Sequence, residues 1–189
     1  MTGRRRESLA ERRERRAAID DPDVVLQAAA RFLEGRARSV AEVRRRLGRA
    51  GFRSDLIEAA VARMTELGML DDESFGRAWV ESRDRAHPRG ERALRRELQL
   101  KGLDRELIDG VLGDRRDAAN ASGDEGATVD LEAAVRLIAK NARALERVAD
   151  PRARRQRAYA LLARHGFDPE TCREAANRSL DGDPDTEAE

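Results

Sequence analysis

The chain has 189 residues, of which 40% are charged and only 3% aromatic, and its formal net charge is +1. So few aromatic side chains leave little material for one thick globular core, whereas thin helical layers can be packed with Leu, Ala and Val. The single cysteine, Cys172, excludes an intramolecular disulfide, and we expect it to be a small buried apolar residue. No apolar run approaches the ~20 residues of a membrane span, and no apolar stretch of a secretory signal is present, so we expect a cytoplasmic protein.

Charge is unevenly distributed along the chain. Residues 1–16 contain seven Arg and three Glu, residues 131–180 contain eleven basic and six acidic residues, and residues 181–189 contain five acidic residues and no basic one. Basic segments beside an acidic tail indicate an anionic partner. Only two of the 38 basic residues are Lys. The preference for Arg suits bidentate phosphate contacts, although a genome-wide codon bias would explain it equally well.

The first segment, residues 1–21, is charged and nearly free of large apolar residues, which predicts a flexible or loosely helical basic arm. An inert tail and a role in binding are both compatible with this composition. The apolar periodicity that follows predicts a first three-helix module over residues 22–70. Within this module, Ser39 and Glu42 form a capping-box pattern at a helix start, and Gly51 is placed to end that helix in the left-handed conformation.

Two further modules follow the same plan, over residues 71–117 and 131–180. Asp71 and Asp72 open the second module and are acids suited to a helix N-terminus. The polar stretch at residues 118–130 predicts a linker before the third module. Residues 181–189 form an acidic tail, which is either a solubilising end or a competitor of DNA for the basic faces.

One phrase closes a helix in each module: a Leu, three residues, a Gly and a large apolar residue. Its glycines are Gly51, Gly102 and Gly166, and their spacings of 51 and 64 residues become regular once the linker is removed. No run of residues alternates as a strand would. The chain is therefore predicted to be all-α, an elongated tandem array of three three-helix modules with a basic N-terminal arm, a linker before the third module and an acidic tail.

The sequence offers no set of residues for catalysis. Neither Lys has the glycine context of a phosphate-binding loop, and two His with one Cys cannot assemble a zinc site of the usual spacing. His165 is better interpreted as a cap at a helix C-terminus, where it would interact with the helix dipole. We expect no enzymatic activity, no metal and no cofactor.

Basic side chains gather on the middle helix of each module, opposite the face predicted to be buried. These side chains are candidate contacts for a partner protein or for DNA: Arg44, Arg45, Arg49, Arg92, Arg95, Arg96, Lys101, Arg152, Arg154, Arg155, Arg157 and Arg164. Acidic residues are plentiful nearby, so an ordinary solvated face is the alternative interpretation.

An ordered string of residues at fixed spacings runs through the first two modules. It comprises Arg38-Ser39-x-x-Glu42-Val43-x-x-x-Leu47, Gly51-Phe52, Leu67-Gly68-x-Leu70-Asp71-Asp72-x-x-Phe75, Trp79-Val80-x-x-Arg83, Gly90, and Glu97-Leu98-x-x-Lys101-Gly102-Leu103 with Ile108. This string resembles the RecX family of regulatory proteins, which modulate the RecA recombinase. The similarity is strong over residues 24–113 and weak over residues 131–180, and the long linker departs from the family pattern.

The resemblance implies a non-enzymatic partner of the RecA filament, which lies along the filament groove and restrains ATP hydrolysis and strand exchange. It implies a place in DNA repair and the SOS response. Single- and double-stranded DNA are further possible partners, a membrane is not, and a monomer is the default expectation. The alternative is a helix-turn-helix-like protein that acts on DNA directly, since residues 39–64 could form two helices around a Gly turn.

Overall fold

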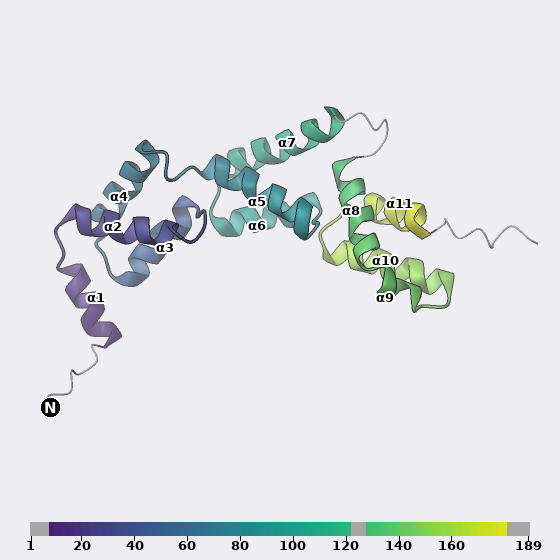
Figure 1. The fold of residues 1–189 in the computed structure, drawn as a ribbon, viewed down its shortest axis with the longest axis horizontal. Coiled ribbons are helices and arrows are strands. Elements are labelled where there is room, and N and C mark those ends of the chain that lie inside the picture. Colours follow the sequence, from purple (N-terminus) through teal and green to yellow (C-terminus); the bar gives the residue numbers. More distant parts are fainter. Residues whose placement is uncertain (1–7, 122–127, 181–189) are drawn as a thin grey trace, which may run out of the picture. The chain divides into compact units, whose positions relative to one another are not determined.

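The computed structural model describes residues 8–121 and 128–180, and every regular element in this part of the chain is an α-helix (Figure 1). The prediction of an all-α chain is confirmed. The eleven helices in these residues are α1 (Leu9–Ala17), α2 (Pro22–Leu33), α3 (Val40–Ala50), α4 (Ser54–Glu66), α5 (Asp72–Ala86), α6 (Glu91–Lys101), α7 (Arg105–Ala121), α8 (Val129–Lys140), α9 (Ala142–Glu146), α10 (Pro151–Arg164) and α11 (Pro169–Leu180).

The described residues divide into two compact units. The first contains the chain up to Phe75 together with Lys101–Leu103, and the second contains the remainder. In the first unit α2 packs against α3 and α4, and α3 packs against α4. Their apolar faces form one core, made of Val25, Ala29, Val43, Leu47, Phe52, Leu56, Ile57, Ala60, Val61, Met64 and Leu70.

Helices α6 and α7 of the second module bury Leu94, Leu98, Ile108, Val111 and Leu112. Polar side chains reinforce this module. Glu97 of α6 accepts hydrogen bonds from two residues of α5, the indole of Trp79 at 2.9 Å and the guanidinium of Arg83 at 2.7 Å. Arg83 also stacks over the Trp79 ring. These contacts fasten α5 to α6.

The third module has four helices in the structure, because the short helix α9 precedes the middle helix α10. Helix α11 packs against α8 and α10. Cys172 is a free, fully buried thiol in this core, as expected from the sequence. Its neighbours in the core are Leu131, Ala133, Ala134, Leu137, Ile138, Leu145, Ala158, Leu162, Phe167, Ala175 and Ala176.

The capping box and the helix-ending glycine predicted for the first module are confirmed, and two aspartates cap helices of the third module. Ser39 and Glu42 exchange both hydrogen bonds of a capping box at the start of α3. Gly51 follows α3 with φ of 100°, in the left-handed region that side chains other than glycine rarely adopt. Asp150 caps α10 before Pro151, and Asp168 accepts hydrogen bonds from the first amides of α11.

The predicted basic arm is a helix over part of its length. Ser8 and Glu11 form a capping box that starts α1, a signal that the interpretation of residues 1–21 as a flexible or loosely helical arm overlooked. Helix α1 packs against α3, and the Arg16 guanidinium lies over the ring of Phe52. Residues 1–7 lie outside the described part of the chain.

The predicted linker at residues 118–130 is shorter in the structure. Helix α7 continues to Ala121, because no Gly or Pro interrupts its last turns, and α8 begins at Val129 with Thr128 as its cap. Residues 122–127 and the acidic tail, residues 181–189, lie outside the described residues.

Candidate functional site

Two exposed arginines lie one turn apart on α3. Arg45 and Arg49 occupy the face opposite the buried Val43 and Leu47. Arg44, at the flank, is committed to Glu58 of α4, with 2.6 Å between Nη2 and Oε2. Arg49 is therefore better placed than Arg44 to meet a partner, and Arg45 lies on the same exposed face.

Helix α6 repeats this arrangement with one change. Arg92 and Arg96 are exposed, whereas Arg95 pairs with Glu91 and with Asp109 of α7. The next residue at the four-residue spacing is Leu100, whose exposed fraction is 68%. The exposed face of α6 therefore combines two guanidinium groups with an apolar side chain.

Helix α10 carries the largest set of arginines. Arg152, Arg157 and Arg164 are exposed, and Arg155 is half-buried. Arg154 is also half-buried, and its Nε donates to the carbonyl oxygen of Val148 at 3.0 Å. In the part of the chain that the structure describes, Arg152, Arg157 and Arg164 form no ion pair, nor do Arg49, Arg92 and Arg96.

Lys101 does not belong to these exposed faces. Its half-buried ammonium lies 2.9 Å from Oε1 of Glu42, and its carbonyl oxygen accepts a 2.6 Å hydrogen bond from the hydroxyl of Ser39. Burial of Glu42 opposes its ionisation, but the hydrogen bonds from Lys101 and from the Ser39 amide hold the pKa of Glu42 below its ordinary value. Lys101 therefore contacts the start of α3 within the first unit.

This connection is one of three equivalent contacts, which we call the joints. In each joint the carbonyl of the residue before a left-handed glycine accepts a hydrogen bond from an earlier part of the chain. The pairs are Ala50 with the guanidinium of Arg16 (3.3 Å), Lys101 with the hydroxyl of Ser39 (2.6 Å), and His165 with the amide of Gly90 (3.1 Å). In the first joint, α1 thus supplies the hydrogen-bond donor that residues at the starts of α3 and α6 supply in the two later joints.

An aspartate completes each of the two later joints. Asp72 at the start of α5 accepts a 2.9 Å hydrogen bond from the first amide of α3, that of Val40. Asp130 near the start of α8 accepts one of the same length from the first amide of α6, that of Glu91. The acids expected at helix starts are therefore used in two ways, since Asp71 caps its own helix and Asp72 caps another.

The joint glycines also lack room for a side chain. A Cβ on Gly102 would overlap the Cβ of Ala41, and a Cβ on Gly166 would overlap Ala93. A Cβ on Gly51 would lie 2.9 Å from the Cα of Arg13. The sequence analysis found these glycines but not their contacts; the recurrence of a small residue at positions 41 and 93 was the available signal.

A buried ion cluster reinforces the joint in front of the third module. Arg115 of α7, whose side chain is 5% exposed, donates to Asp84 of α5 at 2.8 Å and to Asp130 of α8 at 2.6 Å. Burial disfavours the charged guanidinium, but these two carboxylates raise its pKa above the ordinary value. The Asp130 carboxylate therefore holds both Arg115 and the start of α6.

Within the described residues no three His, Cys, Asp or Glu side chains are placed to hold a metal ion. None of the helices there combines the length and apolar composition needed to cross a bilayer.

The comparisons with known proteins agree with the three modules. Family models described as the first, second and third three-helix domains of RecX match residues 26–64, 71–112 and 128–176. The crystal structure of RecX from Lactobacillus salivarius superimposes with a TM-score of 0.69 at 20% identity, over 86% of this chain and 97% of that one.

Three relatives at higher identity are each named regulatory protein RecX. The chain is 44% identical to the protein of Mycolicibacterium vanbaalenii over 43% of its own length and 45% of that relative's length. It is 36% identical to the protein of Mycobacterium avium over 72% and 73% of the two lengths, and 32% identical to that of Chlorobium phaeobacteroides over 85% and 97%. These relatives are named as regulators, in line with the expectation of a non-enzymatic protein. With three domain models in order and a relative matched along nearly its whole length, the chain belongs to the RecX family of regulatory proteins.

Proposed function

We propose that this protein binds the RecA nucleoprotein filament and inhibits its ATPase, recombination and strand-exchange activities. The observation that carries the proposal is the recurrence of exposed arginines on α3, α6 and α10 in a chain of the RecX family. Contacts repeated along a chain of modules raise affinity through effective concentration, without a deep pocket in any one of them. We further propose that the protein acts in the cytoplasm as a monomer.

The exposed Leu100 favours a protein as the main contact of the second module. Leu100 precedes Gly102 by two residues, as Arg49 precedes Gly51 and Arg164 precedes Gly166. Phosphate groups attract arginine at such a position and gain nothing from an aliphatic side chain, whereas protein interfaces combine apolar and arginine contacts. DNA is then met chiefly as part of the filament.

The direct experiment titrates the protein into preformed RecA filaments on single-stranded DNA while ATP hydrolysis is followed. Binding to the naked DNA is measured at the same salt concentration. Inhibition well below one protein per RecA, with weak binding to naked DNA, is expected. Unchanged hydrolysis together with tight, salt-dependent DNA binding would instead establish the helix-turn-helix-like alternative.

The double substitution Arg45→Glu and Arg49→Glu tests whether the exposed face of α3 contacts the filament. Because like charges brought together across an interface cost several kcal/mol, the concentration needed for half inhibition should rise about tenfold or more. The matched control reverses two other exposed arginines of the first module, Arg31→Glu and Arg63→Glu, and so changes the net charge equally. Equal effects of the two variants would mean that total charge matters and the α3 face does not.

A further inference from the structure

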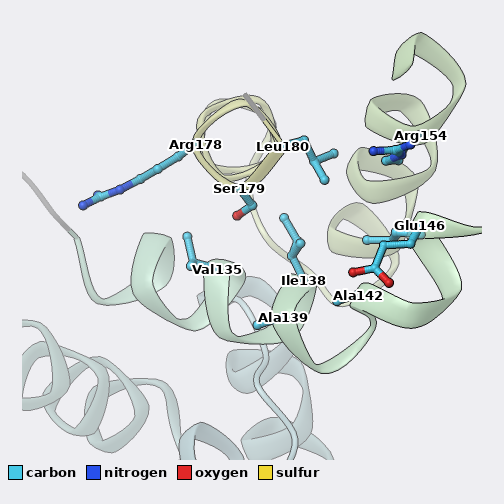
Figure 2. A pocket seen from close by; sticks show the side chains of 10 residues that line it. Val135, Ile138, Ala139, Ala142, Glu146, Arg154, Arg178, Ser179 and Leu180 are labelled. Atoms are coloured by element: carbon cyan, nitrogen blue, oxygen red, sulfur yellow. The ribbon is translucent and has the colours of Figure 1, made fainter. Parts of the chain in front are cut away.

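The third module contains a cavity of about 610 Å³ between α8, α9, α10 and α11 (Figure 2). Aliphatic side chains line it from two sides, among them Ile138 of α8 and Leu180 of α11, and Ala142 of α9 lies at its edge. Arg154 and Glu146 lie on one side of the cavity, whereas the Arg178 side chain, which also contributes to the lining, extends away from the other labelled side chains (Figure 2). The cavity thus combines aliphatic and polar side chains in its lining, and two of the three charged groups there are positive.

The position of this cavity corresponds to the joint surface of the first two modules. Arg154 precedes its left-handed glycine by twelve residues, as Ser39 and Gly90 precede theirs. Ser39 and Gly90 are the residues that donate to the carbonyls of Lys101 and His165 in the joints. The cavity residue Arg154 therefore occupies the position of a joint residue.

A second residue of the cavity, Ser179, also corresponds to a residue of a joint. Ser179 follows Gly166 by thirteen residues, as Arg115 follows Gly102. Arg115 binds Asp130 of the third module, whereas the buried hydroxyl oxygen of Ser179 has no hydrogen-bond partner in the described part of the chain. The surface that joins modules elsewhere is thus uncovered by the described residues in the third module.

A further module or a second copy of this chain does not fit there. An incoming aspartate has no free amide to cap, because the position of Val40 and Glu91 is held by Arg155, which lies inside α10, and the start of α10 is capped by its own Asp150. The incoming glycine would meet Gln156 or Arg157, which stand at the positions of Ala41 and Ala93 relative to the glycines. The end of the array is built for a different occupant.

The chemistry of the opening identifies the occupant. The charged residues of the chain from Ala142 to Arg157 are mostly basic, including Arg143, Arg147 and Arg152, and favour an acidic segment. The aliphatic walls suit an apolar side chain, as in interfaces where an anchor fills a pocket beside charged groups. We propose that this cavity docks a segment of another protein that carries an aliphatic side chain next to a carboxylate. On the proposed function, that protein is a protomer of the RecA filament.

Photo-crosslinking tests the location. A benzoylphenylalanine replaces Ala142, which lines the cavity, or Ala144, an exposed residue of the same helix that does not. After illumination with filaments on single-stranded DNA, the label at position 142 should form a crosslink to RecA and the label at position 144 should not. A crosslink to the DNA, to the chain's own residues 181–189 or to a second copy would overturn the proposal, as would the absence of any crosslink.

Affinity measurements test the chemistry. Ala142→Trp fills the cavity, and Arg178→Glu reverses a charge at its opening; each should weaken co-sedimentation with the filament about tenfold. Ala144→Trp and Arg173→Glu are the matched controls on the same helices and should bind as the wild type does. Thermal unfolding verifies that each variant is folded, and Arg178→Glu carries the test if Ala142→Trp is not, because Arg178 is exposed.

Different results would reject the proposed function and the docking site. If the wild-type protein neither co-sediments with the filament nor changes its ATPase, the proposed function is wrong. If the wild-type protein binds and inhibits while both cavity variants match their controls, the function stands and the docking site is rejected.

Discussion

The glycines of the joints each meet two demands at once. Gly102 has φ of 92°, and its α-hydrogen faces Ala41 where no methyl group fits. The first demand is local and can be predicted from the position of a glycine at a helix end. The second depends on a contact across about sixty residues of sequence, which a single sequence does not reveal.

Replacement of Gly102 by Ala should separate these demands. Gly68 provides the control, because it also has a positive φ, 68°, but open space where a Cβ would stand. The left-handed conformation costs a non-glycine residue about 1–2 kcal/mol, and crowding in a packed site adds about 1–3 kcal/mol. Urea denaturation should therefore show a larger loss of unfolding free energy for Gly102→Ala than for Gly68→Ala. Equal losses would show that the contact with Ala41 relaxes without cost.

Among the predicted site residues, the structure separates two roles that the sequence could not. Arg49 and Lys101 both belong to the middle helices and both precede a joint glycine. Arg49 is exposed, whereas Lys101 is half-buried against Glu42. A charge that lies near the end of a helix in sequence can thus be either a surface group or part of a joint, and only the tertiary contact distinguishes them.

At the scale of elements, α1 shows how a helix can form without an apolar stripe. None of its residues is buried, and the sequence offers mainly charged side chains over residues 9–17. What orders it is the capping box at Ser8 and the packing of its backbone at Arg13 against Gly51. Residues 9–17 lack apolar periodicity, and for that reason the sequence predicts an arm there.

Removal of α1 should destabilise the first unit. A variant that lacks residues 2–18 loses the hydrogen bond from Arg16 to Ala50 and the contact of Arg16 with Phe52, each worth about 0.5–1.5 kcal/mol. Urea denaturation should give a midpoint below that of a control that lacks only residues 2–7. If the two truncated proteins unfold together, α1 contributes nothing to the unit.

At the scale of the whole molecule, the three-module plan could be predicted because local sequence signals for helix ends recur from module to module. The Leu and Gly phrase and the capping box of Ser39 each indicate one helix end. The joints could not be predicted, because most of their hydrogen bonds join a side chain to a backbone carbonyl or amide far away in the sequence, and any sequence supplies such backbone groups. The cavity of the third module was missed for a related reason, since only the tertiary structure shows which surfaces the described residues leave uncovered.

Acid should weaken this protein in two steps. The pKa of His165 is lowered by burial, and by Arg89 and Arg164 nearby, while the Pro88 carbonyl acts in the opposite direction. Below its ordinary value of 6.5 the unfolded chain takes up a proton that the folded chain resists, so stability falls as the pH passes from 7 toward 5. Carboxylates with lowered pKa, such as Glu42 and Asp168, add a second loss at lower pH.

Thermal unfolding of His165→Gln at several pH values isolates the first step. This variant should lose the slope between pH 7 and 5, whereas replacement of the exposed His87 by Gln should keep it. A slope that survives in His165→Gln would assign the effect to other groups.

The start of α10 also bears on how such an array can change in length. An in-frame duplication of the third module would place its copy against Arg155, whose amide lies inside α10, and against Arg157 in place of a small residue. A duplicate of the second module inserted after the original would meet Glu91 and Ala93, and both joint contacts would be available. By gene duplication, this protein can acquire modules in its interior but not at its end.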